Sequence, residues 1–180
     1  AIKPYVKFGV SPFGIYRNKQ QDETGSETNG LSNYDNLYAD TQLWANNGWV
    51  DYIIPQLYWE VGHPAANYTT LFNWWKENKA PDVQMYIGQD VSRSQDQIAK
   101  KLNPTRVAEN ISGNCFWSGD MLLANKNEYK DSLQTAYFKH HAIAPNYPKL
   151  SHTAPVKPEN VRLELMGSEP KLCWDADKTP

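Results

Sequence analysis

The sequence predicts an α/β fold with a parallel sheet, and three observations carry this prediction. Short apolar segments rich in β-branched and aromatic residues alternate four times with longer helical segments. Strands that are separated by helices pair in parallel through right-handed crossovers. No glycine-rich phosphate loop follows any of these strands, which disfavours a nucleotide-binding fold. The residues alone fit either a small open sheet or half of an eight-unit barrel.

The first unit is a strand over residues 5–10, which ends where Pro12 and Gly14 break the pattern. A long polar connection then leads to a helix over residues 34–46, with Gly48 placed to end it. A connection of that length inside a compact domain is usually functional or disordered. The remaining predicted elements are a strand over residues 50–54, a helix from Asn67 to Pro81, a strand over residues 83–88, helices over residues 94–102 and 104–110, a strand over residues 113–118 and a final helix over residues 128–140.

The chain changes character after His141, where prolines become frequent. Residues 144–158 are predicted to be a semi-rigid linker between a main domain, residues 1–143, and a short β segment, residues 159–180. Two alternating stretches in that segment predict two strands. Two short strands cannot form a domain by themselves, so we expect the start of a β-sandwich.

Composition limits the partners of this chain. Its 180 residues carry a net charge of −2 with 18 basic residues, which leaves no basic stripe for nucleic acid. No apolar run approaches the ~18 residues of a membrane span. The 7 Trp and 11 Tyr exceed the 5 Phe, so most aromatic rings have a polar group. Rings of this kind stack on a ligand and also hydrogen-bond to it. We therefore expect a carbohydrate partner, with core packing as the alternative role of these rings.

The sequence indicates no cofactor and no metal site. Two of its four histidines are adjacent at a predicted helix end, where they oppose the helix dipole, and none has metal-ligand spacing. Cys115 and Cys173 lie in different segments, and we expect each to be a buried free thiol. The chain opens on Ala1 without an initiator methionine, as expected of a processed or excised piece.

Four polar or aromatic side chains crowd the end of the second strand, namely Gln56, Tyr58, Trp59 and Glu60. Parallel α/β proteins bind their ligands at this end of their strands. We expect Glu60 to be a general acid, because its apolar neighbours can shield it from water. A solvated loop acid is the alternative. We interpret Gln56 and Tyr58 as substrate hydrogen-bonders on one face, since they are two residues apart.

Other candidates follow the third, fourth and first strands. Asp90 is the second predicted carboxylate, although it can equally cap the next turn through backbone N–H groups. Gln89 beside it is a predicted substrate-binding residue. Trp117, like Trp59, is a candidate stacking platform for a sugar ring.

Arg17 and Asn18 closely follow the first strand and are also predicted to bind substrate, since a guanidinium can hold a hydroxyl or carboxylate group. For Arg17 the alternative is a salt bridge within the long loop. Asp51 lies near the start of its strand, where we expect a structural hydrogen bond. Trp74 and Trp75 lie on a helix and are expected to pack against the sheet.

Several motifs, in order, resemble one known family. They comprise residues 6–18, residues 34–40 with Trp44, residues 50–59, Trp74-Trp75, residues 86–88 and residues 113–118. Through them, residues 5–145 resemble the glycosyl-hydrolase-like family 10 proteins, formerly called DUF187. That family is similar to TIM-barrel glycosidases, which implies that the four strands are the fifth to eighth of a (β/α)8 barrel. Residues 155–174 resemble the start of a fibronectin type III-like domain.

The resemblance implies a glycoside hydrolase that acts on a polysaccharide or cell-wall glycan through two carboxyl groups. It also implies an extracytoplasmic location, either secreted, periplasmic or on the cell surface. The family's first four strands, one of which is expected to supply a catalytic carboxylate, are not in this sequence, so we expect the chain alone to be inactive. The open edges of a half barrel predict self-association. Two alternatives remain, a noncatalytic carbohydrate-binding domain and a purely structural domain of a surface protein.

Overall fold

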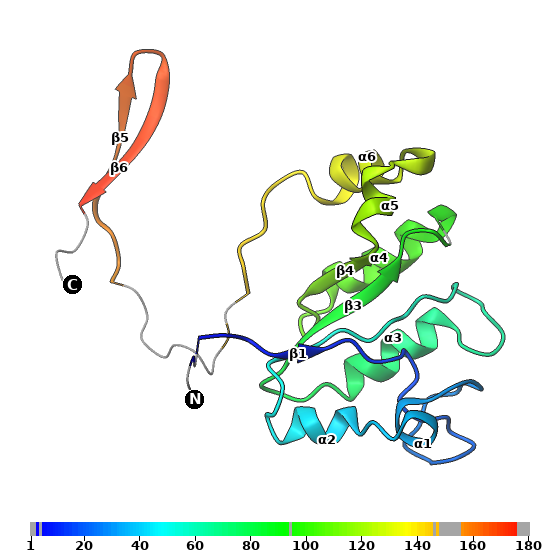
Figure 1. The fold of residues 1–180 in the computed structure, drawn as a ribbon. Coiled ribbons are helices and arrows are strands. Elements are labelled where there is room, and N and C mark those ends of the chain that lie inside the picture. The colour runs from blue at the N-terminus through cyan, green and yellow to red at the C-terminus, as the bar shows by residue number, and fades with distance from the viewer. Residues whose placement is uncertain (1–2, 4, 94, 146, 148–155, 176–180) are drawn as a thin grey trace. The chain divides into compact units, whose positions relative to one another are not determined.

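The computed structural model contains a four-stranded parallel sheet and a separate β-hairpin (Figure 1). It describes residues 3, 5–93, 95–145, 147 and 156–175. The chain divides into two compact units, residues 1–147 and residues 148–180. Most of the predicted linker over residues 144–158 lies outside the described residues.

The sheet consists of β1 (Gly9–Val10), β2 (Tyr52–Ile53), β3 (Gln84–Asp90) and β4 (Gly113–Trp117). Strands that follow one another in the chain are neighbours in the sheet, and every pair is parallel. Right-handed crossovers that always advance in one direction put all their helices on one face. A doubly wound sheet instead reverses its strand order. The predicted α/β fold with a parallel sheet is confirmed, and the arrangement is consistent with half of a TIM barrel.

The first two strands are shorter than predicted, because a side chain takes part in their pairing. The Phe8 N–H donates to Oδ2 of Asp51 at 2.8 Å, and the Asp51 N–H donates to the Phe8 carbonyl at 2.7 Å. The expected structural hydrogen bond of Asp51 is confirmed. It ties the chain ahead of β1 to the start of β2.

The predicted helix over residues 34–46 is wrong, since two helices lie there, α1 (Asn33–Leu37) and α2 (Thr41–Asn46). Tyr38 ends α1 in the left-handed conformation, with φ 55°. Asp40 then caps α2 by accepting from the Leu43 N–H at 2.9 Å, and it also accepts from the Tyr16 hydroxyl at 2.8 Å. An Asp side chain that bonds to the backbone in this way starts a new helix in place of continuing the old one.

Helix α3 (Tyr68–Glu77) matches the prediction, including its first turn. The Asn67 side chain accepts from the Thr69 N–H at 3.0 Å, as expected of an N-cap residue. Trp75 is fully buried, and its indole N–H donates to the Gly14 carbonyl at 2.7 Å. Trp74 is partly buried and stacks on Tyr16 at 5.5 Å between ring centroids. Both tryptophans are therefore packed within the protein.

The later helices differ more from the prediction. After η1 (Gln95–Gln97), the two helices predicted over residues 94–110 are a single helix, α4 (Ile98–Val107), which continues through Pro104. The final helix predicted over residues 128–140 is wrong. Four short elements lie there and just before it, α5 (Gly119–Leu123), η2 (Lys126–Glu128), α6 (Tyr129–Ser132) and η3 (Leu133–Tyr137).

The break comes at Asn125, Asn127 and Glu128, which all adopt left-handed backbone conformations. The Asn125 side chain accepts from the Lys130 N–H at 2.9 Å and donates to the Asp131 carboxylate at 2.8 Å. Such local side-chain bonds compete with a continuous helix.

The core lies between the sheet and its helices. Apolar side chains of β2 and β3 pack there against α2 and α3, and the fully buried residues of this cluster include Ile53, Leu71, Trp75, Met85 and Ile87. A second, smaller cluster joins α4 and α6 to the turn after β3. One face of the sheet is thus covered by helices.

The second unit contains an antiparallel hairpin of β5 (Glu159–Met166) and β6 (Glu169–Asp175). The register sets Leu163 opposite Leu172, and Arg162 opposite Cys173. Residues directly opposite each other share a face, so one face of the hairpin is apolar and the other is polar. The apolar residues Val161, Leu163, Leu165, Leu172 and Trp174 are all exposed.

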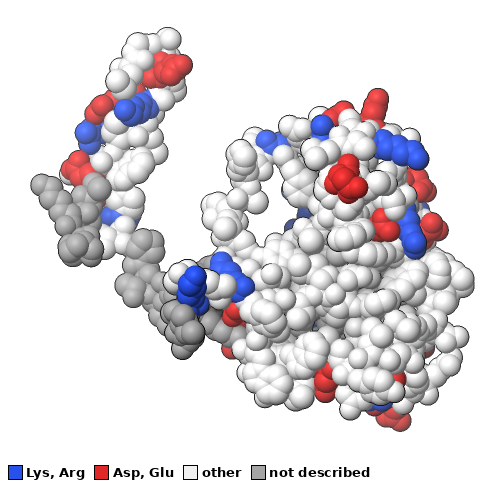
Figure 2. Space-filling view, in the orientation of Figure 1, with Lys and Arg blue, Asp and Glu red and all other residues white. Residues whose placement is uncertain are grey.

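No helix within the described residues is both long enough and apolar enough to span a membrane. Figure 2 shows that a broad central area of the N-terminal unit, as seen from this side, carries neither acidic nor basic side chains. The charged side chains in view lie mostly around that area.

Gly88 permits the closest approach between β3 and the end of β2. A Cβ atom at this position would lie 2.8 Å from the Pro55 carbonyl oxygen and 3.1 Å from the Gln56 Cα. We predict that Gly88→Ala lowers the free energy of unfolding by about 1–3 kcal/mol, measured by urea denaturation. Gly119→Ala is the control, because a Cβ there has no neighbour within 4 Å. Equal losses from both variants would contradict this account.

Candidate functional site

The carboxyl ends of the strands meet at one edge of the sheet. Asp90 and Trp117 are the last residues of β3 and β4, and they pair directly across the ladder. Parallel bridges join Gln56 to Phe13 and to Gly88, so the chain beyond β1 and β2 reaches the same edge. Site residues that follow different strands are thereby brought together.

The face of the sheet opposite the helices carries aromatic side chains. The rings of Tyr52 and Tyr86 meet edge to face at 6.3 Å between centroids. Along β4, Cys115 and Trp117 are exposed on this face, and Trp117 has 66% of its surface accessible. Asn114, which precedes Cys115 and points to the other face, bonds to Gln89 and Thr105 on the helix side of the sheet. We call the surface that carries Tyr52, Tyr86, Cys115 and Trp117 the open face.

Asp90 is held firmly at the edge. Its Oδ1 accepts from the backbone N–H of Ser92 at 2.8 Å and from the Ser92 hydroxyl at 2.5 Å. Its Oδ2 lies 3.4 Å from Nε of Arg93, and the Asp90 side chain is 10% exposed. The turn-capping alternative is therefore present in the structure. Its fixed orientation does not conflict with a role toward substrate, which stays a prediction.

Tyr58 is a partly buried residue between the end of β2 and Glu60. Burial raises the pKa of the Tyr58 hydroxyl, and electrostatic interactions with Cys115 and Asp90 raise it further. Tyr129 of α6 is buried as well, which raises its pKa to about 12, and Asp90 contributes to this shift. The ladder between β3 and β4 sets Cys115 opposite Gly88 and Trp117 opposite Asp90, so these side chains share the carboxyl end of the sheet.

Glu60 sits on a well-anchored loop but is itself exposed. Its carbonyl accepts from the N–H groups of His63 and Tyr68, both at 3.2 Å. The next residue, Val61, donates its N–H to Oε1 of Gln97 at 2.7 Å. The shielding from water that we expected from its neighbours is not found among the described residues, since the side chain projects from the loop. Its role as general acid stays a prediction.

Gln56 and Trp59 are engaged within the protein. The Gln56 amide donates to the Ser11 carbonyl at 2.9 Å, and this bond ties β2 to the chain after β1. Trp59 is partly buried and packs against the core. A Cβ at Gly14 would come within 2.6 Å of the Trp59 ring, so the ring fits a space that glycine leaves open. The exposed Trp117 therefore has a freer ring face than Trp59.

Gln89 faces the helices, away from Asp90. It is buried, and its amide donates to the Tyr68 hydroxyl at 3.0 Å and to Oδ1 of Asn114 at 2.9 Å. Asn114 in turn donates to the Thr105 hydroxyl at 2.8 Å. Neighbouring residues of a strand point to opposite faces, so Gln89 and Asp90 cannot both face the open face.

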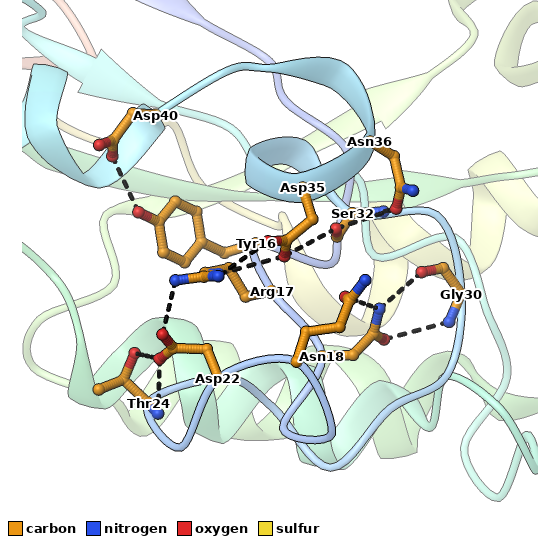
Figure 3. Close-up of polar contacts among 11 residues, drawn as sticks. Tyr16, Arg17, Asn18, Asp22, Thr24, Gly30, Ser32, Asp35, Asn36 and Asp40 are labelled. Atoms are coloured by element: carbon orange, nitrogen blue, oxygen red, sulfur yellow. Dashed lines mark hydrogen bonds and ion pairs between the residues drawn. The ribbon is translucent and has the colours of Figure 1, made fainter.

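Arg17 clamps the long loop between β1 and α1 (Figure 3). Its guanidinium forms a two-point contact with Asp35, at 3.1 and 2.8 Å, and a third bond to Asp22 at 2.6 Å. It also lies over the Tyr34 ring, 4.4 Å from the centroid. The salt-bridge alternative for Arg17 is thus realised, and substrate binding by Arg17 stays a prediction.

Asn18 is buried beneath the same loop (Figure 3). Its amide N–H groups donate to the Gly30 carbonyl at 2.8 Å and to Oε1 of Gln21 at 2.9 Å. Its Oδ1 accepts from the Gly30 N–H at 3.1 Å and from the Thr28 hydroxyl at 3.0 Å. Asn18 therefore shapes the loop, which is ordered by its own hydrogen bonds.

Lys101 of α4 is a residue that the sequence reasoning missed. It is 4% exposed, and its Nζ has no hydrogen-bond partner among the described residues. The ammonium lies 5.1 Å from the centroid of the Tyr68 ring. Burial lowers the pKa of Lys101, while Asp90, Glu60 and Asp96 act in the opposite direction. Its position beside Leu102 on the buried stripe of α4 is the signal that could have identified it.

The described residues contain no group of three or more His, Cys, Asp or Glu side chains that could hold a metal ion. Both cysteines are free thiols. The expectation that each is buried is wrong. Cys115 is exposed because it lies on the open face of β4, and Cys173 on the hairpin strand β6 is only partly buried.

The fold and the site together define an α/β protein with its candidate carboxylates and rings at the carboxyl edge of a parallel sheet. The family model described as glycosyl hydrolase-like 10 matches residues 1–106, and the chain belongs to this family.

Two proteins named as glycosyl hydrolases are also similar in sequence to this chain. The glycosyl hydrolase YngK of Bacillus subtilis (strain 168) is 42% identical over 171 residues, covering 88% of this chain and 34% of that protein. The glycosyl hydrolase DigH of Escherichia coli (strain K12) is 47% identical over 89 residues, covering 49% of this chain and 20% of that protein. The chain thus matches about a third of the length of YngK and a fifth of that of DigH.

Lys101 gives the stability of the chain a specific pH dependence. The pKa of Lys101 in the folded chain is lower than its ordinary value of 10.5, which applies to the unfolded chain. At a pH between the folded and the unfolded pKa, the unfolded chain binds more protons than the folded chain. The free energy of unfolding therefore rises with pH in this range. We predict that Lys101→Met raises the free energy of unfolding at pH 7 by roughly 1 kcal/mol or more. The gain should shrink as the pH approaches 10.5. Urea denaturation at several pH values, with the exposed Lys100→Met as control, measures both. A pH-independent difference would refute the assignment.

The Arg17 clamp should be specific to a guanidinium. A lysine has no planar fork for Asp35 and cannot reach Asp22 at the same time. We predict that Arg17→Lys destabilises the loop by about 1–3 kcal/mol, seen as faster amide hydrogen exchange over residues 18–30. Lys19→Ala, which removes the exposed Lys19–Glu27 pair, should change exchange little. Unchanged exchange in Arg17→Lys would disprove the clamp.

Proposed function

We propose that residues 1–143 form the C-terminal half of a TIM-type barrel that acts on a polysaccharide or cell-wall glycan. Family membership, the sequential parallel strand order and the single helix-covered face support this proposal. The observation that carries it is the carboxyl edge, where Asp90 and the exposed Trp117 pair at the ends of β3 and β4. A sugar ring stacked on Trp117 would have its hydroxyl groups within reach of polar side chains.

The chemistry would be glycoside hydrolysis by two carboxyl groups. One protonates the glycosidic oxygen, while the other attacks the sugar carbon or activates a water molecule. Glu60 is our candidate for the acid, because it is exposed and free to approach a ligand. Asp90 is the candidate for the second carboxylate, because Ser92 and Arg93 fix its orientation. Preorganised groups of this kind favour the transition state.

A noncatalytic carbohydrate-binding domain is the second candidate. Both carboxylate oxygens of Asp90 already have partners within the chain, and Glu60 is not shielded from water by the described residues. In this alternative the aromatic side chains hold the glycan, and no carboxylate pair cleaves it. The two candidates share the binding site and differ in turnover.

We further propose that other strands complete the barrel at the outer edges of β1 and β4, either from the same polypeptide or from a second copy. Among the described residues no strand pairs with the outer edges of β1 and β4, and these edges, together with the exposed rings on the open face, favour such pairing. We interpret the amphipathic hairpin as the first two strands of a fibronectin type III-like sandwich, because its apolar face is exposed. An extracytoplasmic location rests on the family resemblance.

Trp117→Ala tests the binding site. We predict that it weakens oligosaccharide binding about tenfold in calorimetric titrations, because the stacking surface is lost. Trp49→Ala is the matched control, since Trp49 is 62% exposed but precedes β2 at the opposite edge. Equal effects of the two substitutions would overturn the proposed site.

Glu60→Gln and Asp90→Asn in the complete natural protein test the chemistry. Each keeps the shape of the side chain and removes the acid or base, so turnover should fall roughly 10²–10⁴-fold while binding survives. Glu77→Gln on the exposed side of α3 is the control. Turnover that neither substitution changes would favour the noncatalytic alternative.

A further inference from the structure

The loop between β1 and α1 contains a pocket of about 450 Å³. Gly30 and Leu31 line it together with five carboxamide side chains, those of Asn18, Gln20, Gln21, Asn29 and Asn36. Its volume lies within the range of small-molecule sites. No charged side chain contributes to the lining.

The floor of this amide pocket is rigid. Asn18 is 6% exposed and bonds to both backbone groups of Gly30 and to the side chain of Gln21 (Figure 3). The Arg17 clamp holds the two sides of the same loop together. A ligand would therefore meet a preformed surface and would not have to order the loop.

The walls of the amide pocket keep unused hydrogen-bonding groups. Within the described part of the chain, the side chains of Gln20 and Asn29 make no hydrogen bond. The carboxamide oxygens of Gln21 and Asn36 accept hydrogen bonds. The NH₂ groups of the same two side chains have no hydrogen-bond partner among the described residues. A carboxamide both donates and accepts, which matches the hydroxyl groups of a sugar.

The charge around the amide pocket favours a neutral ligand. Lys19 and Arg17 are the nearest cations in the sequence. Lys19 is paired with Glu27, and the charge of Arg17 is balanced by Asp22 and Asp35. Leu31 adds an apolar patch that is 46% exposed. A pyranose ring has an apolar face and a rim of hydroxyl groups. Carboxamides that hydrogen-bond to the hydroxyl groups, around an apolar patch that contacts the face, are the features of a site for such a ring.

The amide pocket also belongs to the edge of the sheet that carries the candidate site. The loop follows the carboxyl end of β1, and the Asn29 N–H donates to the Ala65 carbonyl at 2.8 Å. Ala65 lies in the loop that begins with Glu60. Resting on the function proposed above, we propose that the amide pocket is a second subsite, which binds an uncharged sugar unit of the same glycan chain.

A double variant, Gln20→Ala with Asn29→Ala, tests the subsite in the chain. Neither side chain makes a hydrogen bond in the described structure, so the fold should persist, as an amide NMR spectrum would verify. Titrations with cellotetraose and with tetra-N-acetylchitotetraose cover hydroxyl-only and acetamido-bearing sugars. We expect the better ligand to bind about tenfold more weakly to the double variant, while Asn46→Ala, on α2, leaves binding unchanged.

Direct contact is read from the side-chain NH₂ signals of Gln20, Gln21 and Asn29, which should shift when the tetrasaccharide binds to the natural sequence. Trp117→Ala in the same titrations separates the two proposals. If binding depends on Trp117 but not on Gln20 and Asn29, the subsite is overturned while the proposed function stands. If binding fails only in the double variant, the subsite stands and the Trp117 site is overturned. If neither sugar shifts these signals, the subsite is overturned.

Discussion

The alternation of side chains along β3 fixes which groups can act together. Met85, Ile87 and Gln89 point toward the helices, so Tyr86 and Asp90 point to the open face. Parallel pairing with β4 extends this division to the neighbouring strand, where Trp117 is exposed beside Asp90. A shift of register by one residue would exchange the two sets and bury a carboxylate in the helix layer. The site therefore depends on the packing that holds β3 in register, including the close contact at Gly88.

Much of the fold could be predicted from the sequence, because local patterns determine it. The four strands, the α3 helix with its Asn67 cap and the parallel order all follow from periodicity and known crossover rules. The breaks within helices could not be predicted in the same way. They depend on side-chain hydrogen bonds, such as those of Asp40 and Asn125, that compete with helix continuation only in the folded geometry.

The candidate site was less predictable than the fold. Sequence position indicates that Gln89, Asp90 and Trp117 come at strand ends, but the face of each residue depends on strand register. The engagement of Arg17 with Asp22 and Asp35 depends on how a long loop folds back on itself. Lys101 could be found only by asking why a lysine occupies the buried stripe of a helix. A buried ammonium without a hydrogen-bond partner is costly, and such groups often occur near functional sites.

Binding and cleavage make different demands on this edge. Binding requires rings and hydroxyl-matching groups, and the described residues already offer Trp117 and the amide pocket on preorganised supports. General acid catalysis also works best where water is excluded from the reacting bond. Glu60 is exposed, so if it is the proposed acid, that exclusion has to come from the glycan itself or from whatever covers the open face. Under the function proposed above, glycan affinity would therefore belong to this chain by itself, whereas turnover would be coupled to the covering of the sheet.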